Sequence, residues 1–85
     1  MNNELEIFKK KLIYRAGYRG TKEMDILLSK FVDKYINSLP EDKLKSLYEF
    51  LNLEDDKIFQ IYQKKIKLEK DKFNEITRLF IDFRI

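Results

Sequence analysis

The chain has 85 residues, of which 44% are hydrophobic and 39% are charged, and its formal net charge is +3. A chain of this length forms one small domain, here expected over residues 1–85, with little room for a deep active-site cleft. The sequence has no cysteine and no histidine, which excludes disulfides and a zinc site and removes the commonest general base near neutral pH.

The first segment, from about residue 3 to residue 18, has the spacing of an amphipathic helix. Its apolar side chains fall on one helical face: Leu5, Phe8, Leu12 and, widening the stripe, Ile13. The only two glycines of the chain, Gly17 and Gly20, follow it. We expect one of them to end the helix in a left-handed conformation.

The second segment has the clearest helical pattern in the chain. Thr21 is a plausible N-cap, and Glu23 and Asp25 place negative charge in the first turn, where it suits the helix dipole. The apolar face then follows at helical spacing: Met24, Leu27, Leu28, Phe31 and Tyr35. We expect this helix to end near Asn37.

Two shorter helices are predicted next. Pro40 is expected at the first helical position of one, which carries an apolar stripe of Leu44, Leu47, Tyr48 and Leu51. The acidic run of residues 54–56 interrupts that stripe and offers a new N-cap. The following short apolar helix contains Ile58, Phe59, Ile61 and Tyr62.

A fifth helix is predicted from about Glu69, with Phe73, Ile76, Phe80 and Phe83 on one face. No stretch alternates in the manner of a β-strand, and no hairpin turn signal occurs. The expected fold class is therefore all-α, a small single-domain five-helix bundle. The side chains that we expect to be largely buried are Met24, Leu27, Leu28, Phe31, Leu44, Leu47 and Phe80.

The sequence gives no sign of a membrane span or a targeting segment. No apolar run approaches the ~20 residues that a membrane helix needs. Glu4 and Glu6 lie close to the start, unlike the residues of a secretory signal or a transit peptide. We expect a cytoplasmic protein.

Catalytic and metal-binding patterns are also missing. Neither glycine belongs to a phosphate-binding loop, and Asp55 and Asp56 are read as a helix cap with a solvated neighbour. We therefore expect no enzyme activity, no metal and no cofactor held by the chain. Basic residues cluster at 9–11 and from 64 to 72, which leaves a nucleic-acid or membrane-surface binding module as the alternative function.

The connector between the first two helices contains more charged and aromatic side chains than a turn requires. It can be read simply as a helix stop followed by a cap, or as an exposed recognition loop, because Tyr and Arg are enriched at interface hot spots. The residues that we expect at a partner-binding surface are Arg15, Tyr18, Arg19, Gly20, Glu23 and Asp25.

This connector resembles the signature of the succinate dehydrogenase flavinylation factors, the SdhE-type assembly proteins, in which an R-G-x-x-E loop precedes an acidic residue, a leucine-rich helix and Phe. The matching stretch reads Arg19-Gly20-Thr21-Lys22-Glu23-Met24-Asp25-Ile26-Leu27-Leu28-Ser29-Lys30-Phe31. The likeness continues through the leucines of residues 44–51 and the acidic turn of residues 54–56. It covers roughly residues 8 to 63, and it departs from the family at Ile61, where members usually have Trp.

The resemblance implies a small helical assembly factor rather than an oxidoreductase. Its implied partner is the flavoprotein subunit of succinate dehydrogenase and often that of fumarate reductase, and it promotes covalent attachment of the partner's FAD to a histidine of that subunit. We expect the protein to be a monomer when it is not bound to its partner. We also expect Gly20 to allow close approach of the partner, and Arg19 and Glu23 to hydrogen-bond it.

Overall fold

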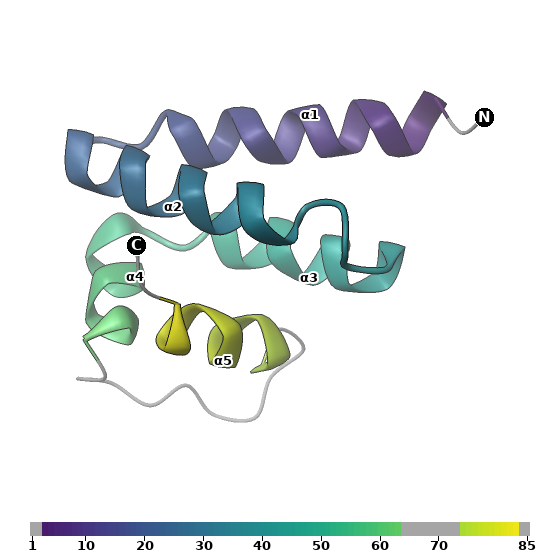
Figure 1. Cartoon of the computed structure of the whole chain (residues 1–85). Helices are drawn as coiled ribbons and strands as arrows, with labels where there is room; N and C mark the ends of the chain where they lie inside the picture. The colour runs from purple at the N-terminus through teal and green to yellow at the C-terminus, as the bar shows by residue number, and fades with distance from the viewer. Residues whose placement is uncertain (1–2, 64–73, 84–85) are drawn as a thin grey trace.

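The structure, a computed structural model, describes residues 3–63 and 74–83 (Figure 1). In these ranges it contains helices and no strand, which confirms the all-α prediction. The helices are α1 (Asn3–Gly17), α2 (Lys22–Tyr35), α3 (Glu41–Leu51), α4 (Asp55–Tyr62) and α5 (Asn74–Asp82). The predicted start near Glu69, Phe73 and the basic cluster of residues 64–72 lie outside the described residues.

The helices pack in an order that puts α3 between the two halves of the bundle. α1 contacts α2 and α3, and α5 contacts α3 and α4. In Figure 1 the connector between α1 and α2 lies at the same end of the molecule as α4, and α3 begins at the other end. The end that holds the connector is therefore also the corner where α3 passes into α4.

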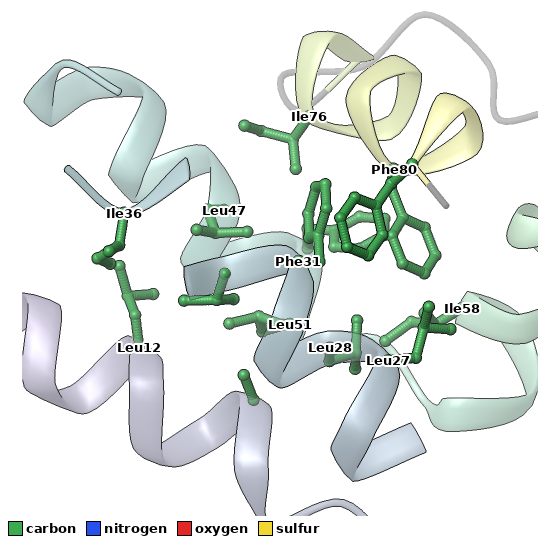
Figure 2. Close-up of a cluster of buried hydrophobic side chains, with 14 of the residues drawn as sticks. Leu12, Leu27, Leu28, Phe31, Ile36, Leu47, Leu51, Ile58, Ile76 and Phe80 are labelled. Atoms are coloured by element: carbon green, nitrogen blue, oxygen red, sulfur yellow. The ribbon is translucent and has the colours of Figure 1, made fainter. Parts of the chain in front are cut away.

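The core is formed by the predicted apolar faces. All seven side chains that the sequence predicts as core are buried, which confirms that prediction. Phe31 of α2 is central, because its ring lies 5.0 Å from that of Phe80 and 6.5 Å from that of Phe50, measured between centroids (Figure 2). Ile13 does not widen the buried stripe of α1 as predicted, since its side chain is 51% exposed.

The helix ends follow the predicted chemistry with one correction. Thr21 is the N-cap of α2, and its hydroxyl accepts a hydrogen bond from the Met24 backbone N–H at 3.3 Å. Pro40 is the N-cap of α3, with extended backbone, and not its first helical residue. Its carbonyl accepts from the Leu44 N–H at 3.0 Å, so it is followed by the helix that the sequence predicts there. α2 ends at Tyr35, slightly before the predicted Asn37.

Two polar contacts hold α5 on the bundle. Lys43 of α3 forms an ion pair with Glu75 of α5 at 2.6 Å, and the hydrogen bond to Glu75 raises the pKa of Lys43 above its ordinary value. The Tyr62 hydroxyl of α4 donates to the backbone carbonyl of Phe83 at 2.9 Å. None of the described helices is long and apolar enough to cross a membrane.

Candidate functional site

Arg19 is the residue that fixes the connector in place. Its guanidinium donates from Nε to Asp55 Oδ1 at 2.8 Å, from Nη1 to the Leu51 carbonyl at 2.7 Å and from Nη2 to the Leu53 carbonyl at 2.9 Å. Nη1 also reaches the Arg15 carbonyl at 3.3 Å. The Arg19 side chain is only 9% exposed, so most of its hydrogen-bonding capacity is used inside the protein.

The position of this guanidinium follows from the electrostatics of helix ends. The last carbonyls of a helix have no partner within it and carry partial negative charge, which suits a cation at the end of α3. The first turn of a helix favours an anion, which suits Asp55 at the start of α4. A planar guanidinium with several donors can serve both ends at once. Arg19 therefore ties the connector to the corner between α3 and α4.

The backbone of the connector is held by carboxylates. The Arg19 N–H donates to Asp25 Oδ1 at 2.5 Å, and the Gly20 N–H donates to Asp55 Oδ2 at 3.1 Å. Asp55 thus binds two successive residues of the connector. It is the first residue of α4 and not a helix cap, since the N-cap position is taken by Glu54, whose side chain makes no capping bond.

These contacts give Arg19 and Asp25 a structural role within the protein, and their expected role in partner binding stays a prediction. The sequence places both among the exposed partner-binding residues, but the structure turns them inward, where they order the connector. Arg15 also turns inward: its guanidinium donates to the Asn52 side chain and lies 5.2 Å from the centre of the Tyr48 ring. The Arg15 Nε is buried without a hydrogen-bond partner among the described residues.

The glycines have a different role from the predicted one. Neither Gly17 nor Gly20 has a left-handed backbone, so neither ends α1 in that way. At Gly17 a Cβ would lie 3.3 Å from Ser29 Oγ, which makes Gly17 a point of close approach between α1 and α2. Gly20 is exposed, and a Cβ there would meet Asp55 Oδ2 at an ordinary contact distance of 3.4 Å.

Several predicted residues do remain on the surface. The Tyr18 side chain is 72% exposed and its ring stacks on that of Tyr14, with 4.4 Å between centroids. Glu23 is exposed in the first turn of α2. Within residues 3–63 and 74–83 it has no hydrogen-bonding or ion-pair partner. Tyr18, Gly20 and Glu23 are therefore the predicted binding residues that are free to meet another molecule.

Two open hollows adjoin the Arg19–Asp55 pair. The first, of about 420 Å³, is lined by Tyr18, Arg19, Glu54, Asp55 and Asp56. The second, of about 220 Å³, is lined by Thr21, Glu23, Met24, Asp55, Asp56 and Phe59. Because both hollows share two residues of α4, they form one surface with the connector. We define the connector face as five exposed residues of this surface together with Tyr14, whose ring stacks on that of Tyr18: Tyr14, Tyr18, Gly20, Glu23, Asp56 and Phe59.

Sequence reasoning missed the contribution of α4 to this surface. Asp55 lies 36 positions from Arg19, and nothing local in the sequence links the two. The sequence pattern places Phe59 in a short apolar helix but does not predict that its side chain is exposed. The pairing of a buried arginine with the acidic start of a helix would have identified this surface. It can be recognised only once the relative position of the connector and α4 is known.

The composition of the connector face is that of a recognition surface. No group of side chains able to hold a metal ion occurs in the described part of the chain. The connector face presents two stacked tyrosines, a glycine (Gly20) and the exposed carboxylates of Glu23 and Asp56. Aromatic and charged side chains around an ordered loop are typical of a protein–protein contact.

A family model and several curated proteins that are similar to this chain all carry names that refer to succinate dehydrogenase. The family described as flavinator of succinate dehydrogenase matches residues 10–84. Mitochondrial succinate dehydrogenase assembly factor 2 of Dictyostelium discoideum is 32% identical over 91% of this chain and 55% of its own length. The proteins of the same name from Arabidopsis thaliana and Scheffersomyces stipitis are 38% and 40% identical over 59% and 68% of this chain. No solved structure gives a significant match.

The comparisons correct the expected cellular location of the protein. The chain spans between 27% and 55% of the length of these three relatives. All three are named as mitochondrial proteins, so the expectation of a cytoplasmic protein is wrong. That expectation rested on the acidic residues near the start of the sequence. The start of a chain that covers only part of its relatives carries no such information.

Proposed function

The chain belongs to the family of flavinators of succinate dehydrogenase, and from this membership we propose that it binds the flavoprotein subunit of succinate dehydrogenase and promotes covalent attachment of FAD to it. The family match over residues 10–84 is the observation that carries this proposal. The chain acts as a non-catalytic helper that holds no cofactor of its own and is monomeric when free. The flavoprotein of fumarate reductase is a second proposed client.

The mechanism that we propose uses the connector face as the docking surface. In this mechanism Arg19 does not contact the partner but holds the connector in one conformation. The binding of Tyr18, Gly20 and Glu23 to the partner then costs little conformational entropy. Binding favours the conformation of the flavoprotein in which its own histidine attacks the flavin, which is a shift between existing states. The helper then dissociates unchanged.

The alternative function, binding of nucleic acid or of a membrane surface through lysines, has less support. Among the described residues 9–11, Lys9 donates to the Asn37 side chain at 3.3 Å and Lys11 lies 5.8 Å from the centre of the Tyr48 ring. Only Lys10 of that cluster has no internal contact of this kind. A complex driven by phosphates would lose orders of magnitude in affinity over a few-fold rise in salt.

The test of the proposed function is a flavinylation assay in cells that lack this protein. The flavoprotein subunit is separated by denaturing gel electrophoresis, and its covalent flavin is read as in-gel fluorescence. We expect the fluorescence to be strongly reduced without the protein and restored when the protein is supplied. Equal fluorescence in both cases, with no capture of the flavoprotein by the purified chain, would rule the function out.

Glu23→Gln is expected to weaken binding to the flavoprotein subunit by about tenfold or more while leaving the fold intact, because an exposed carboxylate at an interface acts mainly on association. Glu4→Gln is the matched control, since Glu4 occupies the same position in the first turn of α1 and is exposed. Affinity is measured by calorimetry and stability by thermal unfolding. Equal affinities of the two variants would remove Glu23 from the interface.

Gly20→Arg is expected to abolish flavinylation while keeping the helix content, because a long side chain at an exposed backbone segment prevents close approach of a partner. Gly20→Ala is the control. A Cβ at this position makes only an ordinary contact, so the free energy of unfolding should change by no more than about 0.5–1 kcal/mol. Covalent flavin and circular dichroism are measured for both variants. Normal flavinylation by Gly20→Arg would place the docking surface elsewhere.

A further inference from the structure

We propose that the hollow between the first turns of α2 and α4 receives an arginine or lysine side chain of the flavoprotein. This inference rests on the proposed function and adds the chemistry of the contact. The hollow lies next to the connector, and α4 supplies half of its lining, including Asp56 and Phe59. It extends the docking surface beyond the residues of the R-G-x-x-E loop.

Two large apolar side chains, those of Met24 and Phe59, line the hollow. Phe59 is 45% exposed although it is a large hydrophobic residue, and Met24 lies beside it in the lining. The methylene groups of a lysine or arginine pack on such a surface while the charged end stays at the rim. An aromatic ring also attracts a cation placed over its face. A purely apolar occupant would leave the rim acids facing it without a partner.

Three of the lining residues are acidic, and within the described part of the chain not all three carboxylates have a partner. Asp55 is already paired with Arg19. Glu23 and Asp56 are exposed, and neither has an ion-pair partner among the described residues. The neighbouring lysines, Lys22 and Lys57, also form no ion pair with them in that part of the chain. Each of these carboxylates carries a full negative charge, which exceeds the partial positive charge of about one half at the start of its own helix. The hollow therefore keeps a net negative charge that complements a cation.

The geometry favours a partner's side chain over a small free cation. A metal ion would need three or more oxygen ligands converging on one point, and no such group occurs in the described residues. A long basic side chain needs only an apolar stem site with carboxylates at its end. This is the arrangement that Phe59, Glu23 and Asp56 provide.

The experiment measures the affinity of the chain for the purified apo-flavoprotein subunit of succinate dehydrogenase at several salt concentrations. Asp56→Lys is expected to raise Kd by about 30-fold or more, and Phe59→Ala by about tenfold, which are the effects of central and flanking interface residues. Asp56→Asn should also flatten the dependence of log Kd on log salt, because it removes a charge. Phe59→Ala should leave that slope unchanged.

Asp42→Lys is the matched control. Asp42 is the second residue of α3, as Asp56 is of α4, and it is exposed. α3 begins at the end of the molecule opposite to α4 (Figure 1). Asp42→Lys should change Kd by less than about twofold. An equal loss of affinity in Asp42→Lys and Asp56→Lys would reduce the effect to net charge and overturn the inference.

The remaining outcomes separate the two proposals. If the wild-type chain binds the flavoprotein and Asp56→Lys and Phe59→Ala bind equally well, this inference fails and the proposed function stands. If the wild-type chain does not bind the flavoprotein, the proposed function fails first. If sedimentation instead shows a dimer of this chain that Asp56→Lys dissociates, the occupant is a second copy and the inference is overturned.

Discussion

Arg19→Ala is expected to lower the free energy of unfolding by about 2–4 kcal/mol and the melting temperature by about 10–25 °C. The substitution removes the bonds to Asp55 and to two backbone carbonyls at the end of α3. It leaves the partly buried Asp55 without its cation, and those carbonyls without their donors. The measurement is thermal and urea unfolding followed by circular dichroism.

Two controls separate this effect from a general loss of charge. Arg78 is an exposed arginine of α5, and Arg78→Ala should change stability by no more than about 0.5 kcal/mol. Arg19→Lys keeps the charge but cannot serve the three acceptors with one planar group, so we expect an intermediate loss. If Arg19→Ala melts as the wild type does but fails to bind the flavoprotein, Arg19 acts at the partner, as the sequence suggested.

The helices and their buried faces could be predicted because both depend on local spacing. The predicted core side chains of α2 and α3, such as Leu28 and Leu47, are buried as their periodicity indicates. Local spacing does not say how wide the buried stripe of each helix is. Ile13 was therefore predicted to widen the apolar stripe of its helix, whereas the structure leaves its side chain exposed.

The connector could be predicted as the important segment, but the direction of its side chains could not. Arg15 in the last turn of α1 and Arg19 in the connector both donate hydrogen bonds to the C-terminal end of α3, to Asn52 and to Leu51 respectively. That direction depends on where α3 ends and exposes its carbonyls, which is a tertiary property. Partner binding by the exposed residues of the connector face stays a prediction.

Phe31→Ala is expected to cost about 3–5 kcal/mol of stability, the largest effect of any single change considered. Phe31 is 1% exposed, and its ring also contacts those of Tyr35 and Phe83, each within 5.4 Å between centroids. A domain of this size has a free energy of unfolding of roughly 4–13 kcal/mol. The loss is a large fraction of that total, so the melting temperature of the variant should lie well below that of the wild type.

The matched control for this prediction is Phe59→Ala, which removes the same ring from the connector face. Because Phe59 is exposed, its loss should lower stability by less than about 1 kcal/mol. Unfolding curves of the two variants should thus differ widely, while both reduce flavinylation in cells, the first through loss of folded protein and the second through weaker docking. A stable, fully folded Phe31→Ala protein would show that the aromatic cluster joining α2 to α5 does not hold the domain together.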